Sequence, residues 1–150
     1  MQAVVDQDHR ERMEALESAM AASDNSIDIT TLECNHYFSH GLYTRELHIP
    51  QGVVITGAIH KYSNVNILSK GKVIAVTDQG RIEIEAPYTF VSNELVKKAI
   101  YAVEDAVWIN VLPWDKEPDV DLVEQEYVIP TYDLLDIQMG LTPAQLLEKE

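Results

Sequence analysis

The region from residue 42 to residue 112 breaks into short segments rich in β-branched and aromatic residues, separated by turns that contain glycine, proline or aspartate. In order, the segments read YTRELHI, GVVITGAIH, VNIL, KVIAVT, RIEIE, YTFVS and AVWINVL. Many short strands at this spacing favour a β-sandwich or a closed barrel. We therefore expect a mainly β domain.

One hairpin is marked by its turn residues. Gly80 ends the sequence Asp78-Gln79-Gly80, and glycine accepts the positive φ that such loops demand. The strand that follows, residues 81–85, alternates charged and apolar side chains. This alternation predicts one solvated face and one packed face.

The chain before this region has the spacing of a helix. In residues 9–22 the larger apolar residues Met13, Leu16 and Met20 lie three and four positions apart, which predicts one apolar stripe. Residues 23–26 are all turn formers, and they would end the helix.

After Pro113 the sequence becomes acidic and irregular, and residues 119–127 and 142–150 each have the pattern of a short helix. At 150 residues the chain has the length of one domain. We predict three parts, which are an N-terminal helical arm (1–26), a β-barrel (27–113) and an acidic C-terminal extension with short helices (114–150).

The net charge of −14 limits the classes of partner. Direct nucleic-acid binding depends on neutralising phosphates, and the only short cluster of lysines is Lys97 with Lys98. We expect no direct nucleic-acid binding. An acidic surface also allows mimicry of nucleic acid toward a DNA-binding partner, although solubility explains the charge equally well.

The cellular location is inferred from missing signals. No apolar run approaches the about 18 residues that a membrane span needs, so no membrane association is expected. The N-terminus lacks the basic segment and apolar stretch of a secretory signal, which predicts a cytoplasmic location. Cys34 is the only cysteine, so an intrachain disulfide is excluded and a buried structural thiol is expected.

Residues 52–71, GVVITGAIHKYSNVNILSKG, resemble the first sequence motif of the cupin superfamily. That motif spaces a glycine, two histidines, a glutamate and a second glycine over two adjoining strands. The frame fits at Gly52, Ala58, His60, Asn64 and Gly71, so one histidine and the glutamate are replaced. Together with the flanking helices, the resemblance implies a cupin-like barrel, a double-stranded β-helix or jelly roll, with an N-terminal helix and short C-terminal helices.

The second cupin motif would follow at Ala86, Ser92, Glu94, Lys97 and Tyr101, and none of these residues matches it. The resemblance to the second motif therefore depends only on its position in the chain and on the strand pattern. The stretches GAIHKYSNVNILSKGKV and KKAIYAVEDAVWINVL are also similar to small cupin-like proteins encoded by bacteriophages. The similarity covers roughly half of the chain.

The metal ligands of cupins are largely missing at the matching positions. Ala58, His60, Asn64 and Lys97 stand where three or four ligands would converge, and only His60 is a good ligand. An ammonium at Lys97 would repel a cation. The resemblance therefore predicts no metal and no cofactor there.

A second metal hypothesis comes from a cysteine and two histidines that precede the motif. Cys34, His36 and His40 offer thiolate and imidazole ligands. Their spacing is unspecific, and ordinary polar residues with one buried thiol explain the same sequence. We prefer this second interpretation.

The resemblance places His60, Asn64, Lys97 and Tyr101 toward the inside of the barrel, where a ligand would lie. An imidazole, an amide, an ammonium and a phenol can together hold a small polar or anionic ligand. Tyr62 is added as an aromatic contact for a flat ligand. A single histidine in a strand is also explained by packing in the core, and this alternative stays open.

Two tryptophans are further aromatic candidates. Trp108 lies in the apolar segment AVWINVL and is expected in the core. Trp114 follows Pro113 in a predicted loop, which makes it the better candidate for an exposed contact, although packing explains both residues.

The leading hypothesis is a non-metal binding or interaction protein of bacteriophage type, acting in the host cytoplasm. It would hold a small ligand in the barrel or dock to a host or virion protein. One alternative is a metal-independent isomerase or epimerase with His60 as base and Tyr101 as acid, although no third group orients the base. The other is the acidic nucleic-acid mimic. We assign no catalytic residue, and we expect a homo-oligomer because exposed sheet edges are commonly covered.

Overall fold

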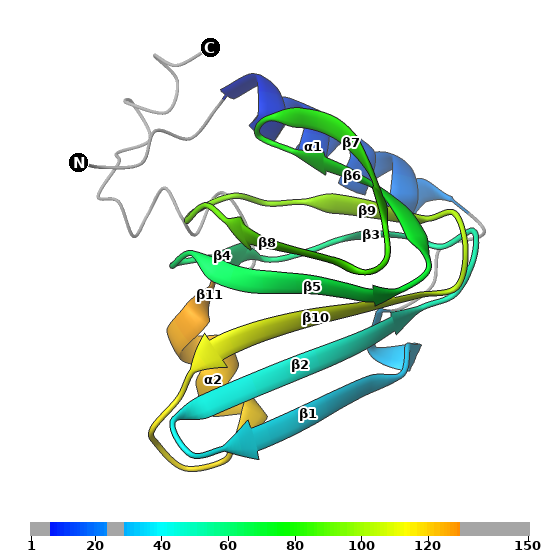
Figure 1. Ribbon diagram of the computed structural model, residues 1–150. Helices are drawn as coiled ribbons and strands as arrows, with labels where there is room; N and C mark the ends of the chain where they lie inside the picture. The colour runs from blue at the N-terminus through cyan, green and yellow to red at the C-terminus, as the bar shows by residue number, and fades with distance from the viewer. Residues whose placement is uncertain (1–6, 24–28, 130–150) are drawn as a thin grey trace, which may run out of the picture.

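The computed structural model describes residues 7–23 and 29–129 (Figure 1). Two helices lie before and after a series of antiparallel strands. The elements in chain order are α1 (Gln7–Ala22), a 3-10 turn (Ile29–Thr31), β1 (Cys34–Ser39), β2 (Leu42–Ile49), β3 (Val54–Thr56), β4 (Ile59–His60), β5 (Asn64–Lys70), β6 (Lys72–Thr77), β7 (Gly80–Glu85), β8 (Tyr88–Ser92), β9 (Ala99–Ala102), β10 (Ala106–Pro113), α2 (Val120–Tyr127) and β11 (Val128–Ile129).

The strands form two larger sheets that face each other and one short pair (Figure 1). One sheet has the order β1-β2-β10-β5-β8 and the other has the order β3-β9-β6-β7, while β4 pairs with β11. Neighbours in each sheet run antiparallel. The expectation of a mainly β jelly-roll barrel with flanking helices is confirmed.

The core lies between the two sheets and comes from alternate residues of their strands. Leu47 and Ile49 of β2 pack in one cluster with Ile100 and Ala102 of β9, and Leu68 of β5 is fully buried in the same cluster. Burying such side chains is the dominant favourable contribution to folding. This alternation also decides which polar side chains point into the barrel.

Helix α1 packs on the barrel through a short apolar contact. Met13 is buried against Ile59, Ala99 and Ile129, and Leu16 lies against the same cluster. These are two residues of the predicted stripe. No helix in the described part of the chain is both long and apolar enough to cross a lipid bilayer.

Helix α2 begins where the acidic composition predicts a helix. The side chain of Asp119 caps it by accepting a hydrogen bond from the backbone N–H of Asp121 at 2.9 Å. Val123 and Tyr127 then pack on Tyr43 of β2. The helix predicted for residues 142–150 lies outside the described residues.

Trp114 packs in the core, as the packing interpretation predicts, and it is not an exposed contact. Trp114 is only 6% exposed, and it packs with Leu112 and Tyr127. Its indole N–H donates to the carbonyl oxygen of Glu117 at 2.7 Å. Helix α2 folds back over the loop, and this non-local contact buries the ring. Trp108 lies in the core, as predicted.

Only part of the apolar face predicted for residues 81–85 is packed. Ile84 is buried, but Ile82 is 40% exposed although it lies on the same face of β7. Strand β7 is the edge of its sheet, so Ile82 has a neighbouring strand on one side only. The hairpin at Asp78-Gln79-Gly80 forms as expected, with Thr77 paired to Gly80.

Gly71 joins β5 to β6 at a position that excludes any side chain. Its φ is +86°, and a Cβ there would overlap the carbonyl oxygen of Asp105 and lie 2.9 Å from the Cα of Ala106. The final glycine of the first motif therefore sets the spacing between β5, β6 and the start of β10. Gly41 has a similar φ of +73° but has no atom near the place of a Cβ.

We predict that Gly71→Ala lowers the free energy of unfolding much more than Gly41→Ala does. Both variants carry the left-handed backbone penalty of about 1 kcal/mol, and the overlap with Asp105 adds about 2 kcal/mol or more in Gly71→Ala alone. Chemical denaturation of the two variants measures the difference. Equal losses would contradict the close approach at Gly71.

Candidate functional site

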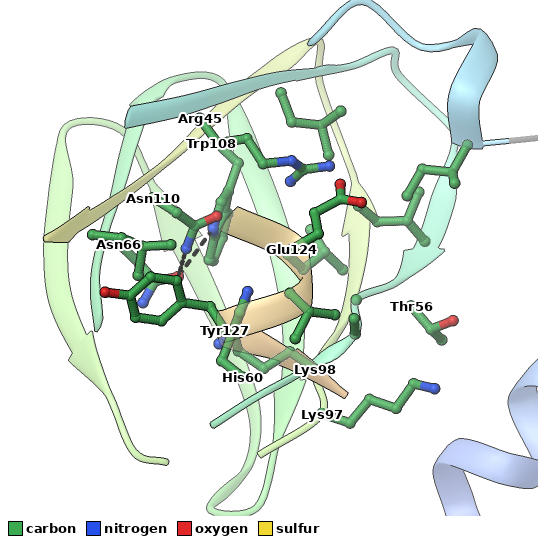
Figure 2. Close-up of a pocket in the computed structure, with 18 of the residues that line it drawn as sticks. Arg45, Thr56, His60, Asn66, Lys97, Lys98, Trp108, Asn110, Glu124 and Tyr127 are labelled. Atoms are coloured by element: carbon green, nitrogen blue, oxygen red, sulfur yellow. Dashed lines mark hydrogen bonds between the residues drawn. The ribbon is translucent and has the colours of Figure 1, made fainter. Parts of the chain in front are cut away.

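A cavity of about 370 Å³ opens into the barrel between β2, β4, β9 and β10, beside α2 (Figure 2). Pockets of this volume suit small ligands. Its apolar wall is formed by Tyr43, Leu47, Ile55, Ile100, Trp108 and Leu112. Its main polar groups inside the barrel are Arg45, His60, Asn66, Lys98 and Asn110. The acidic residues Glu17 and Glu124 come from the two helices.

Pairing of β2 with β10 positions much of this wall. Leu47 is opposite Trp108, and Arg45 is opposite Asn110, so both pairs share a face of the sheet. Tyr43 continues the same face one step along β2. Burial raises the pKa of Tyr43 to about 12, so its phenol is neutral at physiological pH.

Buried amides form a connected network along one side of the cavity. The amide N–H groups of Asn110 donate to the side-chain oxygens of Asn64, at 3.0 Å, and Asn66, at 2.8 Å. Asn66 also donates to Ser92 at 2.9 Å, and it accepts from the indole N–H of Trp108 at 3.1 Å (Figure 2). These mutual bonds satisfy the buried polar groups, so the network fixes the wall and leaves few amide donors for a ligand.

His60 lies in β4 at the edge of the cavity, where the motif spacing predicts it. Its Nδ1 is buried and has no hydrogen-bond partner among the described residues. Burial, followed by the charges of Lys98 and Arg45, lowers the pKa of His60 to about 4. The imidazole is therefore neutral at physiological pH, with one ring nitrogen available.

Lys98 is the buried cation of the cavity. Its side chain is 7% exposed, and it lies beside His60 at one end of the pocket while Arg45 lies at the other (Figure 2). No ion pair joins Lys98 to any residue of the described ranges. Burial lowers the pKa of Lys98 to about 8, and the charge of Asp78 acts in the opposite direction. The amine is still mainly an ammonium at neutral pH.

The two adjacent lysines point to opposite sides of the chain. Lys97 extends toward α1 and forms a salt bridge with Glu17 at 2.7 Å (Figure 2). It shares its side with Ala99, which packs in the cluster around α1, whereas Lys98 shares its side with Ile100 inside the barrel. The motif overlay selects Lys97, which lines the cavity beside Glu17, and the structure adds Lys98 to the same lining.

The other residues selected from the sequence are not gathered around the cavity. Asn64 is buried in the amide network, and the ring of Tyr62 is 53% exposed and lies edge-on to Tyr127. Tyr101 is 40% exposed on the outer side of β9, opposite to the inward Ile100. Only His60 of these reaches the cavity as a free polar group.

The ends of the Arg45 and Glu124 side chains lie near each other in the close-up of the cavity (Figure 2). Arg45 extends from β2, and Glu124 is exposed on α2. No ion pair involving Arg45 is present within the part of the chain that the structure describes. The guanidinium interacts with the thiol of Cys34, and its other N–H groups remain for a bound group.

The metal that cupin-type sites hold does not fit the donors present here. Ala58 has no ligand atom, the Asn64 oxygen is already an acceptor for two amides, and Lys97 is paired with Glu17. Within residues 7–23 and 29–129 no three histidine, cysteine or acidic side chains converge. The cations Lys98 and Arg45 further oppose a bound metal ion.

The cysteine and histidines of the second metal hypothesis are also not assembled into a ligand set. Cys34 is partly buried against the core, and burial raises the pKa of its thiol. His36 Nδ1 lies 2.6 Å from the hydroxyl of Tyr43, and His40 is exposed in the turn after β1.

Comparison with known proteins shows the fold. The sequence matches no family model and no curated protein. The structure resembles KdgF from Halomonas sp., with a TM-score of 0.50 and 12% identity, over 63% of this chain and 88% of that one. It also resembles salicylate 1,2-dioxygenase from Pseudaminobacter salicylatoxidans, with a TM-score of 0.53 and 11% identity, over 80% of this chain and 35% of that one. The chain therefore has the cupin fold, and its chemistry must come from its own residues.

Sequence reasoning missed four residues that define the cavity. Asn66 and Asn110 lie inside strands, where asparagine is disfavoured, and this is the signal that could have marked them. Arg45 lies two residues from both Tyr43 and Leu47, so the period of the strand places all three on the inward face of β2. Lys98 gave no separate signal, because its inward direction depends on the backbone just before β9.

We predict opposite effects of removing the two adjacent lysines. Lys98→Met raises the free energy of unfolding at neutral pH by about 1–3 kcal/mol, because the folded state no longer buries an unpaired ammonium. Lys97→Met lowers it by about 1–2 kcal/mol, because Glu17 loses its partner. Urea denaturation measures both changes.

The lowered pKa of Lys98 also decides whether the free energy of unfolding rises or falls with pH. Between pH values of about 8 and 10.5 the unfolded chain binds more protons at Lys98, so the stability of the wild type rises across this range. The advantage of Lys98→Met should shrink there. Equal destabilisation by both substitutions would contradict the inward position of Lys98.

Proposed function

We propose that this protein is a metal-free cupin-fold binding protein that holds a small anion inside its barrel. The observation that carries the proposal is the pair of basic side chains, Arg45 and Lys98, that line one cavity and form no salt bridge with a described residue. Buried charges cost stability unless they are paired, and a bound anion would supply the missing partner.

The donors of the site favour a carboxylate or a similar oxyanion. Arg45 presents a planar guanidinium, which suits two-oxygen groups, and Lys98 presents a point charge. His60 adds a neutral ring nitrogen beside Lys98. The apolar wall of Leu47, Ile55 and the other apolar residues would cover the carbon skeleton of such a ligand.

The isomerase alternative depends on His60 and Tyr101 acting in one site. Tyr101 lies on the outer side of β9, whereas His60 lines the cavity. The two groups therefore cannot act on opposite sides of one bound substrate. Binding is the function that the geometry supports better.

The wider setting of this function is also part of the proposal. Assembly as a homo-oligomer is supported by the edge strands β1 and β8, which carry exposed Tyr37 and Val91. A bacteriophage origin, a host cytoplasmic location and docking to a host or virion protein are supported by the sequence resemblance alone. Mimicry of nucleic acid is supported only by the net charge of −14.

We predict that Arg45→Gln weakens the binding of succinate by about tenfold or more, because a charge-assisted hydrogen bond is lost. Isothermal titration calorimetry measures the dissociation constant. Arg81→Gln is the matched control, since Arg81 is 66% exposed on β7 and its removal changes the net charge equally. An equal loss in both variants would show that succinate responds only to overall charge.

We predict that the binding of sulfate weakens as the pH rises through about 8, because Lys98 loses its proton there. Sulfate keeps its charge over this range, so the change reports on the protein. The groups around the cavity of Lys98 that carry charge or titrate are His60, Arg45, Asp78, Glu124, Glu17, Lys97, Tyr43 and Tyr127.

Of these groups, the pKa of His60 is about 4 and that of Tyr43 is about 12, so neither explains a change near pH 8. Lys98→Met should bind sulfate weakly at every pH from about 6 to about 9. The same pH dependence in Lys98→Met and in the wild type would contradict the assignment.

A further inference from the structure

The position of Lys98 gives it properties that differ from those of an ordinary salt-bridged lysine. Its side chain is 7% exposed, it lines the main cavity and a second pocket that Asp78 also lines, and no salt bridge joins it to a described carboxylate. Its neighbour Lys97 is equally buried but is bound to Glu17 at 2.7 Å. A buried lysine that faces a ligand cavity and has no carboxylate partner can act as a nucleophile.

The surroundings of Lys98 favour the neutral amine. Burial lowers the pKa to about 8, so about a tenth of the amine is neutral at pH 7. An exposed lysine with a pKa near 10.4 is neutral in well under about one part in a thousand of the molecules. The amine of Lys98 is therefore present at a far higher reactive fraction than the surface amines.

We propose that Lys98 forms an imine with a small oxo-acid whose carboxylate is held by Arg45. This inference rests on the proposed anion-binding function, and it names the ligand class as an aldehyde or ketone that also carries a carboxylate. Arg45 and Lys98 lie at opposite ends of one cavity, which suits a ligand with an anionic end and an electrophilic end (Figure 2).

The chemical step needs no group beyond the amine, the carbonyl and protons. The lone pair of the Lys98 nitrogen attacks the carbonyl carbon, a C–N bond forms, and the carbonyl oxygen takes up a proton. The resulting carbinolamine loses water with the second proton from nitrogen, and the C=N bond forms. No oxidant or reductant is consumed, and hydrolysis reverses the step.

His60 is placed to assist the proton movements. Its Nδ1 is buried without a hydrogen-bond partner in the described chain, and Lys98 lies close enough to lower its pKa. A neutral imidazole can accept one proton and donate another to the departing oxygen. His60 is therefore a positioning and proton-transfer candidate for the same ligand, and this gives its free ring nitrogen a role.

Reductive trapping tests the imine directly. The full-length protein is incubated with pyruvate and sodium cyanoborohydride, digested and mapped by mass spectrometry. We expect a single stable adduct on Lys98, formed about tenfold or more faster than any adduct on a surface lysine. Lys97→Met should be trapped at Lys98 as the wild type is, and Lys98→Arg should lose this adduct.

A parallel measurement separates this inference from the proposed function. Lactate has the carboxylate but no carbonyl, so its binding reports on the anion site alone, and Lys98→Arg keeps the positive charge needed for it. Lactate binding without any pyruvate adduct on Lys98 would overturn the imine and leave the binding function standing. Adducts spread evenly over surface lysines would also overturn the imine. Trapping at Lys98 in a protein that does not bind lactate would overturn the oxo-acid assignment and the anion site together.

Discussion

Antiparallel pairing of β2 with β10 is the constraint on which the rest of this structure depends. It places Arg45 opposite Asn110 and Leu47 opposite Trp108, with all four side chains inside the barrel. A shift of one residue would turn this set to the outer face, because side chains alternate along a strand. The core and the cavity are therefore set by the same register.

On the inner surface of the barrel, some polar side chains have hydrogen-bond partners in the protein, whereas two charged side chains have no salt bridge. Asn64, Asn66 and Asn110 bond to one another, so they hold the wall in place without needing a ligand. No salt bridge joins Lys98 or Arg45 to a described residue, although Arg45 interacts with the thiol of Cys34. Burying a charged group without a partner costs stability, and proteins commonly accept this cost where a ligand binds. The lowered pKa of Lys98 reflects the same cost, because burial disfavours its charged form.

The sequence predicted the barrel because short alternating strands and turn glycines are local signals, and it predicted the inward position of His60 because motif spacing carries over. It did not separate Lys97 from Lys98, since the direction of each depends on the backbone before β9. It could not show that Tyr101 faces outward, because none of the second-motif residues is retained to fix the register. The burial of Trp114 depends on α2 folding back, which is a non-local contact.

Metal content of the freshly purified protein, measured by elemental analysis beside native mass spectrometry, tests the central claim most directly. The account predicts no stoichiometric Fe, Mn, Ni or Zn, because Lys98 and Arg45 occupy the cavity where cupin-type ligands would converge. It also predicts that any small molecule retained by the protein is an acid. Stoichiometric metal that disappears in His60→Ala would contradict the account and return the barrel to metal-dependent chemistry.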